Sequence, residues 1–321
     1  MAERLTRRGL NRNASVDDAA RVLRHGELAH ALELVGDRWT LLILRDAFLG
    51  VRRFEEWRRR TGASPATLTS RLRQLCTHGL LKRTRTHYRL TALGLALYPV
   101  ALSLWRWETK WRREFDLPRK LVHSLCGHTL RPTLECRYCG NEVSLTSVHF
   151  ELHAERCTTK KPAPSRRRRE NLQRRAGVDT HIFHAIDTVG DRWTMLIVAA
   201  LMLGLHRHDE IEVALGIATN ILADRLRRLE LTKVVDRKPY CERPRRYAYR
   251  LTASGRAFFP LVMALQDFGG NGRKGKPSLA LRHLECGRLL GADTVCRACG
   301  DPVRPREVSL TPAHGRDILH A

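Results

Sequence analysis

The chain contains the stretch Val35-Gly36-Asp37-Arg38-Trp39-Thr40-Leu41-Leu42-Ile43-Leu44 and repeats it as Val189-Gly190-Asp191-Arg192-Trp193-Thr194-Met195-Leu196-Ile197-Val198. The two copies lie 154 residues apart. Later segments repeat as well: Leu72-Arg73-Gln74-Leu75 returns as Leu226-Arg227-Arg228-Leu229 at the same offset, and Tyr88-Arg89-Leu90-Thr91 returns as Tyr249-Arg250-Leu251-Thr252 at an offset of 161. A period this long indicates a duplicated domain rather than a solenoid of short units. Each copy, at about 120 residues or more, is large enough for its own core.

The charge balance is strongly basic. Lys and Arg number 58 against 33 Asp and Glu, a net charge of +25 over 321 residues. This excess favours a polyanionic partner. The alternatives are an inert basic surface and an anionic membrane surface, but no long basic amphipathic helix supports a membrane surface as the partner.

The apolar runs are short. Residues 1–15 contain none, and the longest runs, 93–104 and 195–205, are too short to cross a membrane. We therefore expect a cytoplasmic protein without a membrane partner. In that compartment the nine cysteines favour metal ligation over disulfides.

Each copy predicts the helices and hairpin of a winged helix. In the first copy we expect helices over 18–35, 39–49 and 54–60, and a further helix from Pro65 to His78 with Ser64 as its N-cap. Because this last helix is apolar on one side only and follows a short Gly-containing turn, the pair forms a helix-turn-helix. A short basic hairpin at 80–90 is the wing, and a final helix covers 93–111, with Pro99 as a potential kink.

The second copy follows the same plan. Its helix-turn-helix is expected at 208–216 and 221–231, its wing at 235–251, seven residues longer than the first, and its final helix at 258–268. The predicted domains are a disordered basic N-terminus (1–17), winged helix-turn-helix domain 1 (18–115), zinc-binding segment 1 (116–157), a basic linker (158–177), winged helix-turn-helix domain 2 (178–272) and zinc-binding segment 2 (273–312).

Three motifs resemble those of the HxlR-type winged-helix transcription regulators. Residues 36–45 resemble the opening signature of that family, 64–80 are similar to its recognition helix, and 244–255 are similar to its wing. The resemblance covers roughly 25–113 and 180–268, and it implies a cytoplasmic bacterial DNA-binding regulator, usually dimeric. The chain departs from the family pattern because the winged helix is doubled and the first wing is truncated. The frequent family cysteine at the start of the first helix is also absent, with Gly26 and Thr180 at about that place, which argues against thiol-based sensing.

The outer faces of the two recognition helices and the wings supply the candidate DNA contacts. A helix fits the major groove, and basic wing residues hold phosphates. The candidates are Ser64, Ala66, Thr67, Thr69, Ser70 and Arg73, then Arg83, Arg85 and Arg89, then Asn220, Ala223, Asp224 and Arg227, and finally Lys238, Arg243, Arg245 and Arg246. For each single residue the alternative is a solvated helix face, and Asp224 would sit poorly beside phosphate. Arg71 and Arg225 flank the buried stripes and could pair with a nearby acid instead. Because the two faces differ, we predict an asymmetric DNA site.

A repeated His/Cys pattern predicts metal binding. The pattern is His123-x2-Cys126-x9-Cys136-x2-Cys139, and it returns as His283-x2-Cys286-x9-Cys296-x2-Cys299 with every ligand at an offset of 160. Three thiolates and one imidazole suit a structural Zn²⁺, so we predict one ion held within each half, two per chain. His128 is a rival ligand in the first site. Cys76, Cys157 and Cys241 have no counterparts and are expected to be ordinary core or surface residues.

Together these features predict a mainly α protein (α+β winged helix) with two tandem winged helix-turn-helix domains, each followed by a small zinc-ribbon-like segment. The predicted function is sequence-specific regulation of transcription, repression being the commoner outcome for such a module, with double-stranded DNA as the partner. The halves are expected to pack as an intramolecular pseudo-dimer through the helices after the wings, and association of two chains stays open. No phosphate-binding loop, zinc-hydrolase motif or nucleophile elbow indicates an enzyme. The alternatives are a winged-helix interaction scaffold and a metal-responsive regulator.

Overall fold

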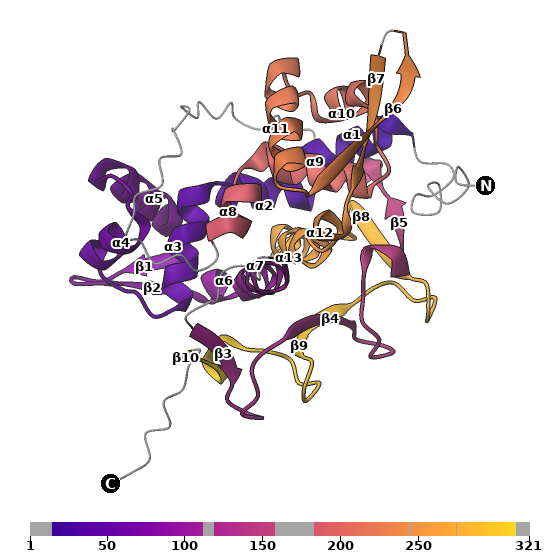
Figure 1. Cartoon of the computed structure of the whole chain (residues 1–321). Helices are drawn as coiled ribbons and strands as arrows, with labels where there is room; N and C mark the ends of the chain where they lie inside the picture. The colour runs from indigo at the N-terminus through magenta and orange to yellow at the C-terminus, as the bar shows by residue number, and fades with distance from the viewer. Residues whose placement is uncertain (1–14, 112–118, 158–182, 244, 274, 313–321) are drawn as a thin grey trace.

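The computed structural model describes residues 15–111, 119–157, 183–243, 245–273 and 275–312 (Figure 1). We call 15–157 the first half and 183–312 the second half. The predicted linker at 158–177 and most of the predicted disordered N-terminus lie outside the described residues. Every helix in the described ranges falls short of the length and apolarity that a membrane span requires.

Each half contains a winged helix followed by three strands. In the first half the elements are α1 (Val16–His25), α2 (Glu27–Val35), α3 (Arg38–Phe48), α4 (Phe54–Thr61), α5 (Pro65–Thr77), β1 (Leu81–Arg83), β2 (Tyr88–Leu90), α6 (Ala92–Leu95), α7 (Tyr98–Trp111), β3 (Arg119–His123), β4 (Pro132–Cys136) and β5 (Val148–Leu152). In the second half they are α8 (Phe183–Val189), α9 (Arg192–Met202), α10 (His208–Leu215), α11 (Thr219–Leu231), β6 (Val235–Glu242), β7 (Arg245–Leu251), α12 (Ala253–Arg256), α13 (Phe259–Gly270), β8 (Leu279–His283), β9 (Ala292–Cys296) and β10 (Val308–Pro312). The predicted fold class of two tandem winged helices is confirmed.

Two of the expected helices are each split in two. The helix expected over 18–35 is broken at Gly26, which is extended, so that α1 packs on α10 of the second half while α2 packs on α13. The helix expected over 93–111 is broken between α6 and α7. Pro99 then lies in the first turn of α7, where its missing N–H is tolerated, and it does not kink a continuous helix. The break at Gly26 comes from packing that helical periodicity does not reveal.

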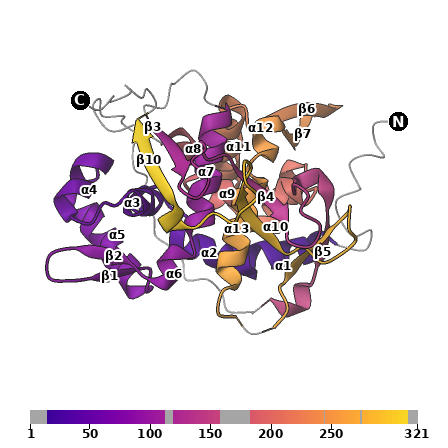
Figure 2. The ribbon, with the colours of Figure 1, turned by 90° about the horizontal axis from the view of Figure 1, so that it is seen from below.

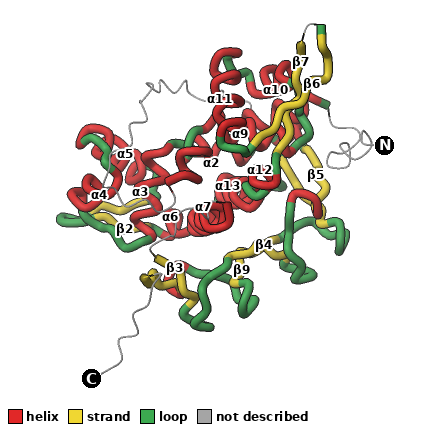
Figure 3. Tube along the Cα trace, viewed as in Figure 1, coloured by secondary structure: helices red, strands yellow, loops and turns green. Residues whose placement is uncertain are grey.

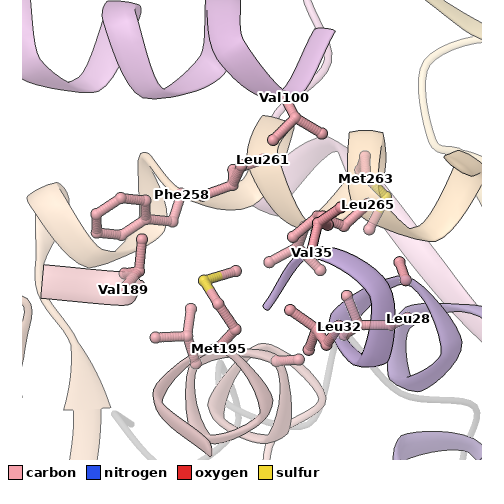
Figure 4. Close-up of a cluster of buried hydrophobic side chains, with 14 of the residues drawn as sticks. Leu28, Leu32, Val35, Val100, Val189, Met195, Phe258, Leu261, Met263 and Leu265 are labelled. Atoms are coloured by element: carbon pink, nitrogen blue, oxygen red, sulfur yellow. The ribbon is translucent and has the colours of Figure 1, made fainter. Parts of the chain in front are cut away.

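The two halves share one hydrophobic core. Leu28, Leu32 and Val35 of α2 lie against Leu261 and Leu265 of α13 (Figure 4). The equivalent helix of the second half, α8, contacts α7 of the first half, and α7 and α13 also contact each other. The helices after the wings therefore meet as predicted. Each of them also covers a helix from the opposite half, which we did not predict.

An approximate twofold axis passes between the two copies of the repeated motif. Asp37 and Asp191, which are equivalent residues, form an antiparallel β-bridge with each other. On one side Arg38 pairs with Asp187 at 2.6 Å, and on the other the equivalent Arg192 pairs with Glu33 at 3.6 Å. The repeat that identifies the duplication in the sequence is thus also the place where the halves meet.

A buried carboxylate fixes the end of the α2–α13 contact. Glu27 is only 6% exposed and accepts hydrogen bonds from Gln266 Nε2 at 2.9 Å and Ser278 Oγ at 2.5 Å. Burial alone would raise the pKa of Glu27, but the donors on Ser278 and Gln266 outweigh burial and lower it. Both side-chain donors come from the second half, so this compensation for burying the carboxylate exists only while the halves are docked.

The strands after the winged helices form one layer made by both halves. All three strand pairs are antiparallel and each takes one strand from each half: β3 with β10, β4 with β9 and β5 with β8. In the β4–β9 pair the equivalent residues Leu134 and Thr294 are opposite each other, which places this pair on the approximate twofold axis. In Figure 1 the β3–β10 and β4–β9 pairs lie below α7 and α13, and the β5–β8 pair lies to the right of α13; the strands are yellow in Figure 3. Figure 2 shows it from beneath.

The docking of the halves can be tested at two adjacent glycines of α13. A Cβ at Gly269 would lie 1.9 Å from the carbonyl oxygen of Glu27, whereas a Cβ at Gly270 would meet only Glu27 Cγ at an ordinary 3.5 Å. Gly269→Ala should therefore force α2 and α13 apart and lower the free energy of unfolding by about 1–3 kcal/mol. Gly270→Ala is the matched control and should be neutral or raise it by up to about 1 kcal/mol through helix propensity. Urea unfolding of both variants measures the difference, and equal midpoints would contradict this packing.

Candidate nucleic-acid interface and metal centres

The helices α5 and α11 each bury one apolar stripe and expose the opposite face. Leu68, Leu72 and Leu75 are buried in α5, and Leu222, Leu226 and Leu229 are buried in α11. Ser64 caps α5 by accepting a hydrogen bond from the Thr67 N–H at 3.2 Å, as predicted. The remaining candidate contacts of α5 are exposed: Ala66, Thr69, Ser70 and Arg73. On α11, Asn220, Ala223 and Arg227 are exposed, and Asp224 is half-buried.

The aspartate of the repeated motif holds each of these helices in place. Asp37 is the N-cap of α3, accepts from the Thr40 hydroxyl at 2.5 Å and pairs with Arg71 of α5 at 3.1 Å. Asp191 caps α9 in the same way and pairs with Arg225 of α11 at 3.1 Å. The interpretation of Arg71 and Arg225 as ion-pair partners is thus confirmed. Because Asp37 and Asp191 also bridge each other, the positions of α5 and α11 are tied to the contact between the halves.

The charge of Asp224 is compensated within α11. Its carboxylate contacts Arg225 and lies 3.2 Å from Arg228 Nε, one turn away. A carboxylate paired in this way repels a nearby phosphate less than an isolated one does.

The two wings differ in length and in how their arginines are supported. In the first wing, β1 pairs with β2 over three residues, and Arg83, Arg85 and Arg89 are exposed. In the second wing, β6 and β7 form a longer ladder with an irregularity between Pro239 and Cys241. Arg237 and Arg245 lie over the ring of Tyr247 at 4.8 and 5.9 Å. The exposed basic residues of this wing include all four predicted ones: Lys238, Arg243, Arg245 and Arg246.

The eight predicted metal-ligating residues gather into two compact groups. One group contains His123, Cys126, Cys296 and Cys299, and the other contains Cys136, Cys139, His283 and Cys286. Within each group the ligand atoms lie within 4.8 Å of one another, so each group could hold a metal ion. His128, the rival ligand, belongs to neither group, and neither do Cys76, Cys157 and Cys241.

The predicted grouping of these ligands was wrong. We expected each half to hold its own four, but each group takes one pair from each half. The reason is the strand register. Pro132, at the start of β4, is opposite Cys296, while Cys136, at its other end, is opposite Ala292. Four residues of extended strand span about 13 Å, so Cys136 cannot reach the group of His123. The register places Cys296 there instead, beside His123 and Cys126.

A glycine after each ligand pair was a signal that the spacing analysis missed. Gly127, Gly140, Gly287 and Gly300 all have positive φ, between 69° and 78°. The N–H of each donates to the carbonyl of the first ligand of its pair at 2.8 Å. This tight turn brings both ligands of a pair to one side, and a side chain at these positions would strain it.

The buried thiols of the two groups differ from the isolated cysteines. Burial tends to raise the pKa of Cys296, but backbone N–H groups of Ala298 and Cys299 outweigh it and lower that pKa. Cys136 behaves in the same way, with backbone N–H groups of Tyr138 and Cys139. Burial raises the pKa of Cys157. Within each group the exposed thiol shifts the other way from the buried one: a backbone N–H lowers the pKa of Cys139 and of Cys299, but burial and hydrogen bonds shared with the neighbouring cysteines outweigh it and raise that pKa.

The family follows from comparison with known proteins. The model of the HxlR-like helix-turn-helix family matches residues 34–116 and 188–276, more than half of the 321 residues. The chain belongs to this family, and it carries the domain twice.

Individual relatives correspond to one copy of the repeat. An uncharacterized HTH-type transcriptional regulator of Mycobacterium tuberculosis is 41% identical over 142 residues, covering 42% of this chain and 90% of that protein. The regulator YvaP of Bacillus subtilis is 42% identical over 79 residues, 24% of this chain and 73% of that protein. Among solved structures, the reduced form of the transcriptional regulator YodB from B. subtilis is 30% identical and covers 30% of this chain and 97% of that one, with a TM-score of 0.27.

Proposed function

We propose that the protein is a sequence-specific transcription regulator that binds double-stranded DNA with both winged helices at once. The observation that supports this most directly is the pair of exposed helix faces, α5 and α11, tied to each other through Asp37 and Asp191 and each flanked by a basic wing. The net charge of +25 provides the attraction to phosphate. The mycobacterial relative is named as a transcriptional regulator, in agreement with this proposal.

The outer faces of α5 and α11 would read different bases. Arg73 and Arg227 occupy equivalent positions, and each can reach guanine or a phosphate. At the other equivalent positions Ala66 corresponds to Asn220, Thr69 to Ala223 and Ser70 to Asp224. Asn220 suits adenine, whereas Thr69 and Ala223 offer a methyl contact to thymine. The wing residues Arg83, Arg85, Arg89, Lys238, Arg243, Arg245 and Arg246 would bind phosphates. The regulatory outcome we propose is repression, by blocking access of the polymerase.

The two metal groups have the spacing of tetrahedral zinc sites. Zn–S bonds of about 2.3 Å and Zn–N bonds of about 2.0 Å imply S···S edges near 3.8 Å and S···N edges near 3.5 Å. The Sγ atoms of Cys126 and Cys296 are 3.9 Å apart, and Nδ1 of His123 lies 3.5 Å from Cys126 Sγ and 3.4 Å from Cys299 Sγ. The second group has the same distances. We propose one structural Zn²⁺ in each group, each linking the two halves.

Two other functions are weaker candidates. An interaction scaffold without DNA would be expected to have neutral or acidic faces and wings, whereas the wings here are basic and Asp224 is compensated. The hypothesis of a metal-responsive regulator is better supported than the scaffold hypothesis. Each group joins the halves, so metal loss would affect the relative position of α5 and α11.

DNA affinity should depend on salt through the wing arginines. Arg245→Ala and Arg246→Ala should each weaken binding to any duplex and reduce the slope of log K against log salt by about 1, because one phosphate contact is lost. Arg282→Ala, an exposed arginine on the strand layer paired with Glu151 at 2.9 Å, is the control and should change neither quantity. Fluorescence anisotropy over a salt series measures both. If the slope of log K against log salt were unchanged in both wing variants, Arg245 and Arg246 would not contact DNA phosphates.

The bound DNA site should be asymmetric. Selection from a random duplex pool with the full chain should return two unlike half-sites, because three of the four compared face positions differ between α5 and α11. Asn220→Ala, which introduces the residue found at the equivalent position in α5, should relax the preference in one half-site only. A pool of perfect palindromes would contradict the assignment of these faces.

Zinc stoichiometry of cysteine variants should reveal the cross-half grouping. Native mass spectrometry should find two Zn²⁺ in the wild-type chain and one in Cys126→Ser, in Cys296→Ser and in the double variant, because both residues serve one ion. The double variant of Cys126 and Cys136, which lie in the same half, should lose both ions. Cys241→Ser is the control and should keep two. If each half held its own ion, the two double variants would give the opposite result.

A further inference from the structure

A cavity between the halves is lined by arginines from both of them. It has a volume of about 630 Å³ and lies beside the first wing. Its apolar wall comes from Ala47, Phe48, Leu90 and Leu95 of the first half. Pro305 and Arg306 of the second half close one side of it, just before β10. A volume of this size holds a small organic molecule.

The charge of this cavity is entirely positive. Its charged lining residues are Arg52, Arg53, Arg89 and Arg306, and no Asp or Glu lines it. Among the described residues, none of these four arginines forms an ion pair with a carboxylate. Arg52 donates to the carbonyl of Ala47 at 3.2 Å and Arg89 to Nε2 of His87 at 2.9 Å, which leaves further N–H groups of both guanidinium groups available. Four like charges around one space favour an anion.

The second half provides an internal comparison, because its equivalent positions differ. The N–H of Tyr88 donates to the Arg52 carbonyl, and the N–H of Tyr249 donates equivalently to His206, which confirms the alignment of the two regions. The equivalent of Arg53 is Arg207, and Arg207 pairs with Asp209 at 2.7 Å. In the first half the residue at the position of Asp209 is Glu55, which pairs with Arg58 instead.

Three more lining positions differ in the second half, whereas Arg89 is matched by Arg250. Leu201 replaces Ala47, which takes up space, and His206 replaces Arg52. Thr146 stands at the position of Arg306. Duplication began with two equivalent regions, and of the two only the first has arginine at all four positions, each without a carboxylate partner among the described residues. This difference is what a ligand site retained in one half would produce.

We propose that this cavity binds a small organic anion, a carboxylate or sulfonate with an apolar body. The anionic group would contact Arg53 and Arg306, and the apolar body would lie on Phe48, Leu90 and Leu95. Inorganic phosphate would satisfy only the arginines and a neutral alcohol only the apolar wall. An occupant would join the base of the first wing to the second half, and it would therefore act on the position of that wing.

The binding test uses the full chain and anilinonaphthalene sulfonate, an aromatic anion whose fluorescence rises in apolar surroundings. The dye should saturate with one molecule per chain at this site. Octanoate should displace it, whereas octanol and inorganic phosphate at the same concentration should not. The double variant Arg53→Ala/Arg306→Ala should bind the dye about tenfold more weakly, because two charge-assisted contacts are removed.

The matched control is Arg207→Ala/Arg304→Ala, which removes the equivalent arginine of the second half and an exposed arginine two residues before Arg306. It should bind the dye like the wild type. Unchanged binding in the Arg53/Arg306 variant, or displacement by octanol as effective as by octanoate, would overturn the proposal. So would a loss of DNA affinity in that variant without dye, since the arginines would then be phosphate contacts. The dye experiment needs no DNA, so its outcome is independent of the proposed regulatory function.

Discussion

The structure depends on an exchange of helices between the two copies of one domain. The α2 helix of the first half packs on α13 of the second, and α8 of the second packs on α7 of the first. The backbones come so close that Gly269 leaves no room for a Cβ beside Glu27, and the Glu27 carboxylate takes its side-chain donors from Gln266 and Ser278. Neither half therefore encloses its apolar surface alone. Since Asp37 and Asp191 lie in the same contact and pair with Arg71 and Arg225, the exchange also fixes where α5 and α11 lie.

The strand layer repeats this exchange with different chemistry. Every strand pair joins the halves, and each His/Cys group lies near one end of the β4–β9 pair, where a turn from one half meets a turn from the other. The strands are short, and two-stranded pairs of this length are marginal in water by themselves. Their buried side chains, such as Leu134, Val148 and Phe150, belong to the same hydrophobic core as the helices. Coordination at both ends of the ladder, together with the Arg137–Asp293 ion pair at 2.7 Å, would add to this burial. The helical core, the strand pairs that pack on it and the His/Cys groups thus all oppose separation of the halves.

Much of the fold could be predicted from the sequence because it is local. The repeated motif, the Ser64–Pro65 helix start and the leucine stripe of α5 each act within one element, and the structure confirms them. The ligand residues were also identifiable, since spacing selects them. Spacing could not show how the eight ligand residues divide into two groups. Four ligands from one half and two pairs from different halves have the same sequence pattern. The break at Gly26 was missed for the same reason: it serves a contact with α10 and α13, some 190 to 240 residues away. The cavity beside the first wing needed the chain fold to bring Arg306 to Arg53.

Because the two copies are joined in one chain, each copy can accumulate substitutions that the other does not share. In a dimer of identical chains every substitution appears twice, so the two half-sites and the two flanking surfaces stay alike. Here the covalent connection keeps the halves at a high effective concentration whatever the protein concentration. The shared core then requires only that residues at the contact be kept, such as the aspartates of the repeated motif. Away from it the halves have diverged: the second wing is longer, and Asp224 stands where the first half has Ser70. Of the four arginines beside the first wing, Arg52 and Arg306 are replaced by His206 and Thr146 in the second half, and Arg53 by Arg207, which is paired with Asp209. The divergence lies on the exposed helix faces, the wings and the cavity, which are the places where a single chain gains from having two different surfaces.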